Sequence, residues 1–158
     1  MFISEDQLVA ELWARDVRFI LGTVPSHPPI LSSVDLIVAL AESKETRLQL
    51  SLIPVFLRHP EFSQNVQFAV KKLKPNLQLL LKCFYSAAVW LEQKYLSTHI
   101  LPDLFSNELG VVPSENPEEN LKKLAKQHQD LSGSKINWLG TYEHAAVVWL
   151  KEIELQKA

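Results

Sequence analysis

The chain has 158 residues, of which 47% are hydrophobic and 22% are charged, and its formal net charge is -2. Length and composition of this kind are typical of one globular domain. The small net charge excludes a whole-molecule attraction to nucleic acid or anionic lipid, so any binding of a polyanion needs a local basic patch. The single cysteine, Cys83, excludes an internal disulfide, and only 4 glycines leave little material for tight hairpins.

The N-terminal segment carries acidic residues before its apolar ones and lacks the basic start of a signal peptide. The most apolar windows, 48–57 and 77–91, are shorter than the ~20 residues that a membrane-spanning helix needs. We therefore expect a cytoplasmic protein with no membrane partner.

Serines and prolines divide most of the chain into apolar segments with helical spacing. Ser4 with Gln7 forms a capping-box pattern, Ser32 and Ser43 can cap the next two helices, and Asn116 before Pro117 marks the start of a later one. Pro60 and Pro75 each suit a first helical turn, where a missing N–H costs nothing. The helices expected from these signals are 5–21, 33–42, 44–58, 60–73, 75–98, 117–129 and 136–156.

These segments predict an all-α fold, a single domain 1–158 formed by a bundle of about six or seven helices. The segment 75–98 is apolar on two faces and should be central. The pairs 33–58 and 60–97 each join a shorter helix to a longer, more apolar one, which raises the hypothesis of HEAT-like stacking in the middle of the chain.

Charge is distributed unevenly along the chain. Residues 1–43 carry two basic against six acidic residues, residues 44–94 eight against three, and residues 95–158 six against nine. The central third, at +5 between flanks of -4 and -3, could dock RNA phosphates or an acidic partner surface. The basic candidates for interaction are Arg47, Arg58, Lys71, Lys72 and Lys74. The alternative is that Lys71 to Lys74 only solvate a helix end.

Trp138, Tyr142 and Trp149 lie along the last expected helix and are candidate anchors for a protein partner or a second copy of the chain. Packing in the core is the commoner fate of such a stripe.

No catalytic, metal or cofactor motif is present. The histidines lack the spacing that places two metal ligands on one helical face. Cys83 lies between apolar residues and is expected to be buried and unreactive. A helical hydrolase or nuclease that uses His59 or His144 as a base stays open, because sequence cannot exclude a carboxylate close in space.

Four stretches, "RLQLSLIPVFLRHPEF", "CFYSAAVWLEQKY", "LPDLFSNELG" and "NWLGTYEHAAVVWL", resemble small uncharacterised helical bacterial proteins associated with a minimal nucleotidyltransferase. A helical protein of this kind and the nucleotidyltransferase beside it resemble the two components of a toxin–antitoxin module. The chain lacks the Asp-x-Asp metal pair of a nucleotidyltransferase, although Gly133 and Ser134 are present. Arg58 beside His59 also departs from the wider Arg and His spacing of helical HEPN-type ribonucleases. The resemblance therefore implies a non-catalytic, antitoxin-like partner.

The leading expectation is a non-catalytic helical protein that regulates or binds another protein. The alternative is an RNA-binding module that uses the basic centre.

Overall fold

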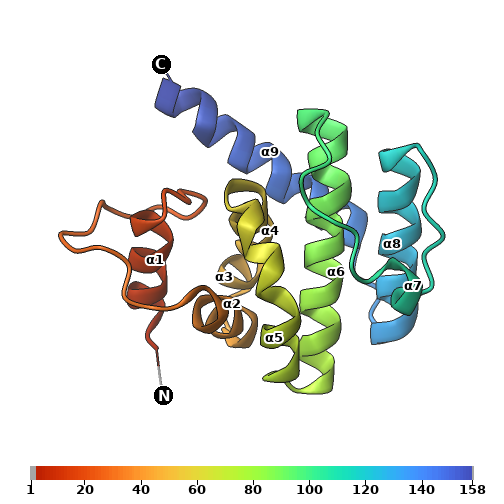
Figure 1. The fold of residues 1–158 in the computed structure, drawn as a ribbon, viewed down its shortest axis with the longest axis horizontal. Coiled ribbons are helices and arrows are strands. Elements are labelled where there is room, and N and C mark those ends of the chain that lie inside the picture. Colours follow the sequence, from red (N-terminus) through yellow and green to blue (C-terminus); the bar gives the residue numbers. More distant parts are fainter. Residues whose placement is uncertain (1–2, 158) are drawn as a thin grey trace.

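The computed structural model describes residues 3–157, and these residues form helices, turns and loops without any β-strand (Figure 1). The prediction of an all-α fold is therefore confirmed. In chain order the elements are α1 (Glu5–Ala14), α2 (Ser33–Glu42), α3 (Thr46–Leu50), α4 (Leu52–Arg58), the 3₁₀ turn η1 (Pro60–Gln64), α5 (Val66–Lys71), α6 (Pro75–Leu91), the π-helical turn η2 (Glu92–Leu96), α7 (Ser106–Leu109), α8 (Pro117–Ser132) and α9 (Trp138–Lys157).

Helix α6 is the centre of the fold, as its two apolar faces predicted. It packs against α8 on one side and against α4 and α5 on the other, while α9 crosses behind and contacts α4, α6 and α8 (Figure 1). Every side chain from Cys83 to Leu91 is buried. Buried apolar side chains contributed by α1 through α9 join into one hydrophobic core.

The middle of the chain is built from two neighbouring helix pairs. Helix α2 packs against α5, and α4 packs against α6. The first helices of the two pairs are thus in contact with each other, and so are the second helices. This pairwise contact is what the stacking hypothesis requires.

Helix α1 is shorter than the expected 5–21, because the chain turns sharply after Ala14. Asp16 has φ of 62°, and Val17 N–H donates to Leu12 C=O while Asp16 N–H donates to Trp13 C=O. These bonds form a Schellman motif with aspartate at the left-handed position that glycine usually takes. Val17 and Leu12 are both buried and supply the apolar contact that accompanies the motif.

The helix 33–42 is confirmed, with Ser32 Oγ accepting a hydrogen bond from the Asp35 amide at 3.1 Å. The single helix expected over 44–58 is wrong. It is divided into α3 and α4 at Ser51, whose hydroxyl donates to Leu48 C=O. Pro54 lies in the first turn of α4, and because it has no N–H it cannot donate to Leu50 C=O, which fits the end of α3 at Leu50.

The segment 60–73 is likewise two elements, η1 and α5, that meet at Asn65. The expected helix 75–98 exists as α6 continued by η2, and it ends at Ser97, whose φ is 55°. The short helix α7 was not expected. Helix α8 starts at the predicted Asn116 cap and continues past the predicted end to Gly133, which has φ of 69°.

Candidate functional site

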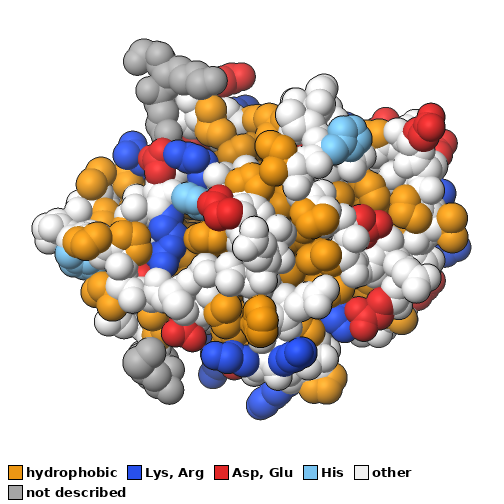
Figure 2. Space-filling view, in the orientation of Figure 1, with side chains coloured by type: hydrophobic (Ala, Val, Ile, Leu, Met, Phe, Trp, Pro, Cys, Tyr) orange, Lys and Arg blue, Asp and Glu red, His pale blue; other side chains and the backbone are white. Residues whose placement is uncertain are grey.

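The turn between α5 and α6 carries a cluster that we call the basic corner: Phe68, Lys71, Lys72 and Lys74. Val70 and Leu73 point into the core, and this orientation leaves the lysines around them exposed. Phe68 is 59% exposed, whereas phenylalanine side chains are usually buried in the core. Figure 2 shows Lys and Arg side chains gathered along the lower edge of the molecule, where α5 and α6 meet.

The charges of the basic corner are only partly compensated. Lys72 Nζ lies 3.9 Å from Asp35 Oδ1, and both side chains are about half exposed. Lys71 Nζ lies 5.9 Å from the centre of the Phe68 ring. Lys71 and Lys74 form no ion pair with any residue that the structure describes. The corner therefore combines an exposed aromatic ring, which Lys71 approaches, with two lysines that form no ion pair among the described residues.

The two candidate arginines are exposed, but they do not join this cluster through any ion pair. Arg58 ends α4 and lies 3.3 Å from Asp16 Oδ2, at the turn that follows α1. Arg47 lies in the first turn of α3, where its backbone amide donates to Glu45. Whether they bind a partner stays a prediction.

The aromatic candidates on α9 belong to the interior. Tyr142 is 0% exposed and Trp149 is 5% exposed, and Trp138 is partly buried against the core. These aromatic side chains therefore follow the alternative expectation, packing against the core, and they offer no exposed anchor for a partner. His128 fixes two of them, because its ring stacks on Trp138 at 3.6 Å and its Nδ1 lies 2.6 Å from the Tyr142 hydroxyl.

Of the side chains considered for catalysis, His59 and Cys83 pack against other residues of the fold, and His144 is exposed to solvent. His59 Nε2 lies 2.6 Å from Arg15 C=O, and its ring stacks on Phe62 at 5.0 Å. His144 is exposed on α9. Cys83 is buried, and desolvation raises the pKa of its thiol to about 12, which disfavours the thiolate that a nucleophile requires.

A partly buried cluster joins η2 to the helices beside it. Lys94 Nζ lies 2.6 Å from Glu143 Oε1 and 3.8 Å from Glu118 Oε1, and the Tyr95 hydroxyl donates to Glu143. Burial acts to lower the pKa of Lys94, but the hydrogen bond and the charge of Glu143 raise it above its ordinary value. Lys94 is paired with two carboxylates and the Tyr95 hydroxyl is hydrogen-bonded, so each group has a partner within the fold and we assign the cluster to packing.

Two buried glutamates were missed by sequence reasoning. Glu11 on α1 accepts from the amides of Ile30 and Leu31 at 3.0 and 2.7 Å, and Glu92 accepts from the amides of Ile100 and Leu101 at 3.1 and 2.9 Å. Each carboxylate thus closes a loop by holding an Ile-Leu pair. The available signal was an acidic residue at an apolar position of a helix, next to Leu12 in one case and Leu91 in the other.

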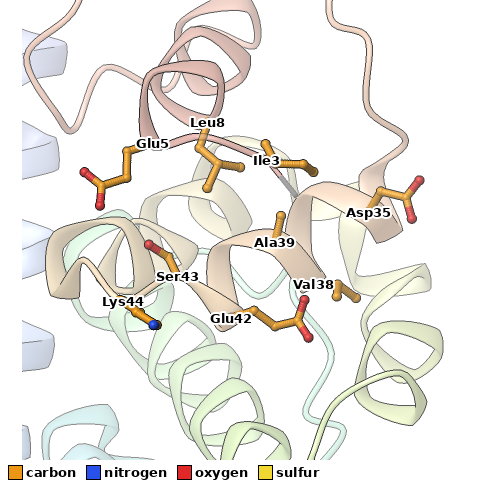
Figure 3. Close-up of a pocket in the computed structure, with 9 residues that line it drawn as sticks. All are labelled: Ile3, Glu5, Leu8, Asp35, Val38, Ala39, Glu42, Ser43 and Lys44. Carbon is orange, nitrogen blue, oxygen red and sulfur yellow. The ribbon is translucent and has the colours of Figure 1, made fainter. Parts of the chain in front are cut away.

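A groove of about 690 Å³ lies between α1 and α2 (Figure 3). Figure 3 shows apolar side chains in its middle and the carboxylates of Glu5, Asp35 and Glu42 around them. We call this the α1–α2 groove. Its lining residues are Ile3, Glu5, Leu8, Asp35, Val38, Ala39, Glu42, Ser43 and Lys44.

Within residues 3–157, no helix combines the length and the apolar character that crossing a membrane requires. The same part of the chain brings together no group of three or more His, Cys, Asp or Glu side chains suited to a metal ion. Comparisons with family models, curated proteins and solved structures found no match to this chain.

Proposed function

We propose that this chain is a non-catalytic, cytoplasmic interaction protein that binds a partner protein through the basic corner. The supporting observation is the exposure of Phe68 beside two lysines that have no ion-pair partner among the described residues. Aromatic side chains such as Phe are enriched at the cores of protein interfaces, and exposed lysines at the edge of an interface steer the approach of an acidic partner. Exposing such a ring in water is unfavourable unless a partner covers it.

The partner that suits this corner presents carboxylates around an apolar pocket. Lysines facing carboxylates accelerate encounter and fix orientation, while burial of the Phe68 ring supplies most of the affinity. The resemblance to antitoxin-like proteins makes a minimal nucleotidyltransferase encoded beside this chain the first partner to test. In that pairing the chain would regulate the enzyme and perform no chemistry.

Co-purification from the native host tests this proposal. The wild-type chain should retain a stoichiometric protein, and the variant K71E/K72E/K74E should lose it. A matched control is K122E/K126E/K135E, which makes the same change of charge at three exposed lysines outside the corner. The control should retain the partner. Equal retention by both variants, or recovery of no stoichiometric protein including a second copy of the chain, would contradict the proposal.

RNA binding is the second candidate, and the position of Lys71 over the Phe68 ring favours it. An exposed aromatic ring beside cations is how many proteins bind single-stranded RNA, because bases stack on the ring while lysines contact phosphates. Fluorescence anisotropy with a labelled single strand should give a log–log salt slope of roughly -0.7 for each contacted phosphate. Binding that K71E/K72E/K74E leaves unchanged would exclude the corner as an RNA site.

A further inference from the structure

The α1–α2 groove is mostly acidic, with three carboxylates against the single ammonium group of Lys44, whereas the basic corner is cationic. Leu8, Val38 and Ala39 are apolar side chains in its middle, and Glu5, Asp35 and Glu42 surround them as exposed carboxylates. Glu5 and Glu42 form no ion pair with any residue from 3 to 157. The groove therefore fits an apolar side chain that is flanked by cations.

The basic corner presents such a group. Phe68 has an exposed ring, Lys71 and Lys74 both follow it in the sequence, and neither of their ammonium groups forms an ion pair with a residue from 3 to 157. The groove, at about 690 Å³, is several times larger than the roughly 150 Å³ cavity that accepts a benzene ring in another protein. The groove therefore has a volume sufficient for a phenylalanine ring.

The two surfaces are contiguous on the molecule. Asp35 lines the groove and also lies 3.9 Å from Lys72 of the corner, because α2 packs against α5. When complementary surfaces adjoin one another, a two-fold rotation can place each of them against its counterpart on a second copy, so every contact is made twice. The pairing joins the segment that carries -4 to the segment that carries +5.

We propose that two copies of this chain form a two-fold dimer in which the basic corner of each copy docks in the α1–α2 groove of the other. This inference rests on the proposed role of the corner as an interaction surface and names its partner as a second copy of the chain. The charged groups at this contact are exposed, so salt screens their attraction and the dimer weakens as ionic strength rises.

Sedimentation velocity of the full chain over a range of concentrations tests the proposal. Ile3 lines the groove, so any tag belongs at the C-terminus. The wild-type chain should dimerise as concentration rises. The corner variant K71E/K74E and the groove variant E5K/E42K should each raise the dimer dissociation constant by more than about tenfold, a factor worth roughly 1.4 kcal/mol. The variant E42K alone is a second groove variant, because a lysine at the C-terminal end of α2 suits the helix dipole.

An equimolar mixture of the corner and groove variants should recover the dimer. In that mixture one contact keeps its native charges and the other has both sets of charges reversed, so opposite charges face each other at both. The controls K122E/K126E and E115K/E154K change exposed charges outside both surfaces and should dimerise as the wild type does.

Three results would overturn the dimer: a wild-type chain that stays monomeric at every concentration, a dimer that neither variant weakens, and a mixture that does not recover association. The co-purification experiment separates this failure from that of the proposed function. A monomeric chain that still retains a different protein through the corner refutes only the dimer. A dimer that recovers on mixing while no other protein is retained refutes only the separate partner.

Discussion

Glu11 is a buried carboxylate that closes the base of the loop between α1 and α2. It accepts hydrogen bonds from the amides of Ile30 and Leu31, and it pairs with Arg15 at 3.1 Å. Burial acts to raise the pKa of Glu11, but the two amides and the Arg15 guanidinium lower it below its ordinary value. The carboxylate is therefore held in its charged form, and the loop depends on that charge.

The substitution Glu11→Gln should lower the free energy of unfolding by about 2 to 4 kcal/mol, because it leaves Arg15 buried without its anion. A glutamate whose pKa is lowered on folding stabilises the protein above its ordinary pKa of 4.5 and loses that contribution as pH falls further. Stability below pH 4.5 should therefore decline less steeply in E11Q than in the wild type. Urea unfolding as a function of pH measures both effects.

The matched control is Glu154→Gln, which changes an exposed glutamate on α9 and should alter stability by less than about 0.5 kcal/mol. An E11Q chain as stable as E154Q at neutral pH would contradict the role assigned to Glu11.

Individual residues differ in whether their structural role could be predicted from the sequence. Ser32 and Asn116 were identified as helix caps because their local patterns are specific, and both cap as expected. Asp16 could not be identified as the end of α1, because aspartate takes the left-handed conformation only when the contacts around it favour that turn. Here Arg18 and Arg58 both pair with its carboxylate.

At the scale of elements, α8 and α9 are joined by an aromatic cluster around His128. The ring of His128 lies flat on Trp138, its Nδ1 meets the Tyr142 hydroxyl, and Phe84 of α6 contacts all three rings edge-on. Desolvation lowers the pKa of His128 to about 4, so the imidazole is neutral at pH 7. The contact between these helices therefore depends on an uncharged histidine.

The lowered pKa of His128 predicts that the contact between α8 and α9 becomes less stable at acidic pH. In the unfolded chain the histidine takes up a proton near its ordinary pKa of 6.5, whereas in the folded chain it does so only near 4. Stability should consequently fall as pH drops through this window, with a slope of at most about 1.4 kcal/mol per pH unit from this group.

The variant His128→Asn should be less stable than the wild type at pH 7, because the stacked ring is lost, but it should lack this part of the pH dependence. His144→Asn, at an exposed histidine, is the control and should keep it. Chemical unfolding at several pH values between 6.5 and 4 provides the comparison. Equal slopes in the wild type and H128N would show that His128 does not carry the effect.

The helices of the chain were predictable to different degrees. Amphipathic spacing together with a specific cap identified α2 and α8 closely, and amphipathic spacing with Pro75 in the first turn identified the start of α6. The segments 44–58 and 60–73 were each read as one helix, because their apolar residues continue across the breaks at Ser51 and Asn65. Pro54 contributes to the break at Ser51, because a proline has no N–H to donate to Leu50 C=O.

At the scale of the whole molecule, the fold converts a charge pattern along the chain into adjoining surfaces. Three of the six acidic residues of the first third line the α1–α2 groove, and three of the lysines of the middle third lie in the basic corner. Because α2 packs against both α1 and α5, these surfaces meet at Asp35 and Lys72. The proposed partner surface and the proposed dimer both follow from this adjacency.

The sequence by itself determined the all-α class, the central place of α6 and the presence of the lysines at a helix end, because periodicity, caps and charge are local properties. It also excluded the known catalytic motifs, which depend on spacing. Only the tertiary structure decided that Tyr142 and Trp149 are buried while Phe68 is exposed. The structure also placed the acidic groove beside the lysines, since burial and adjacency arise from contacts between segments far apart in the chain.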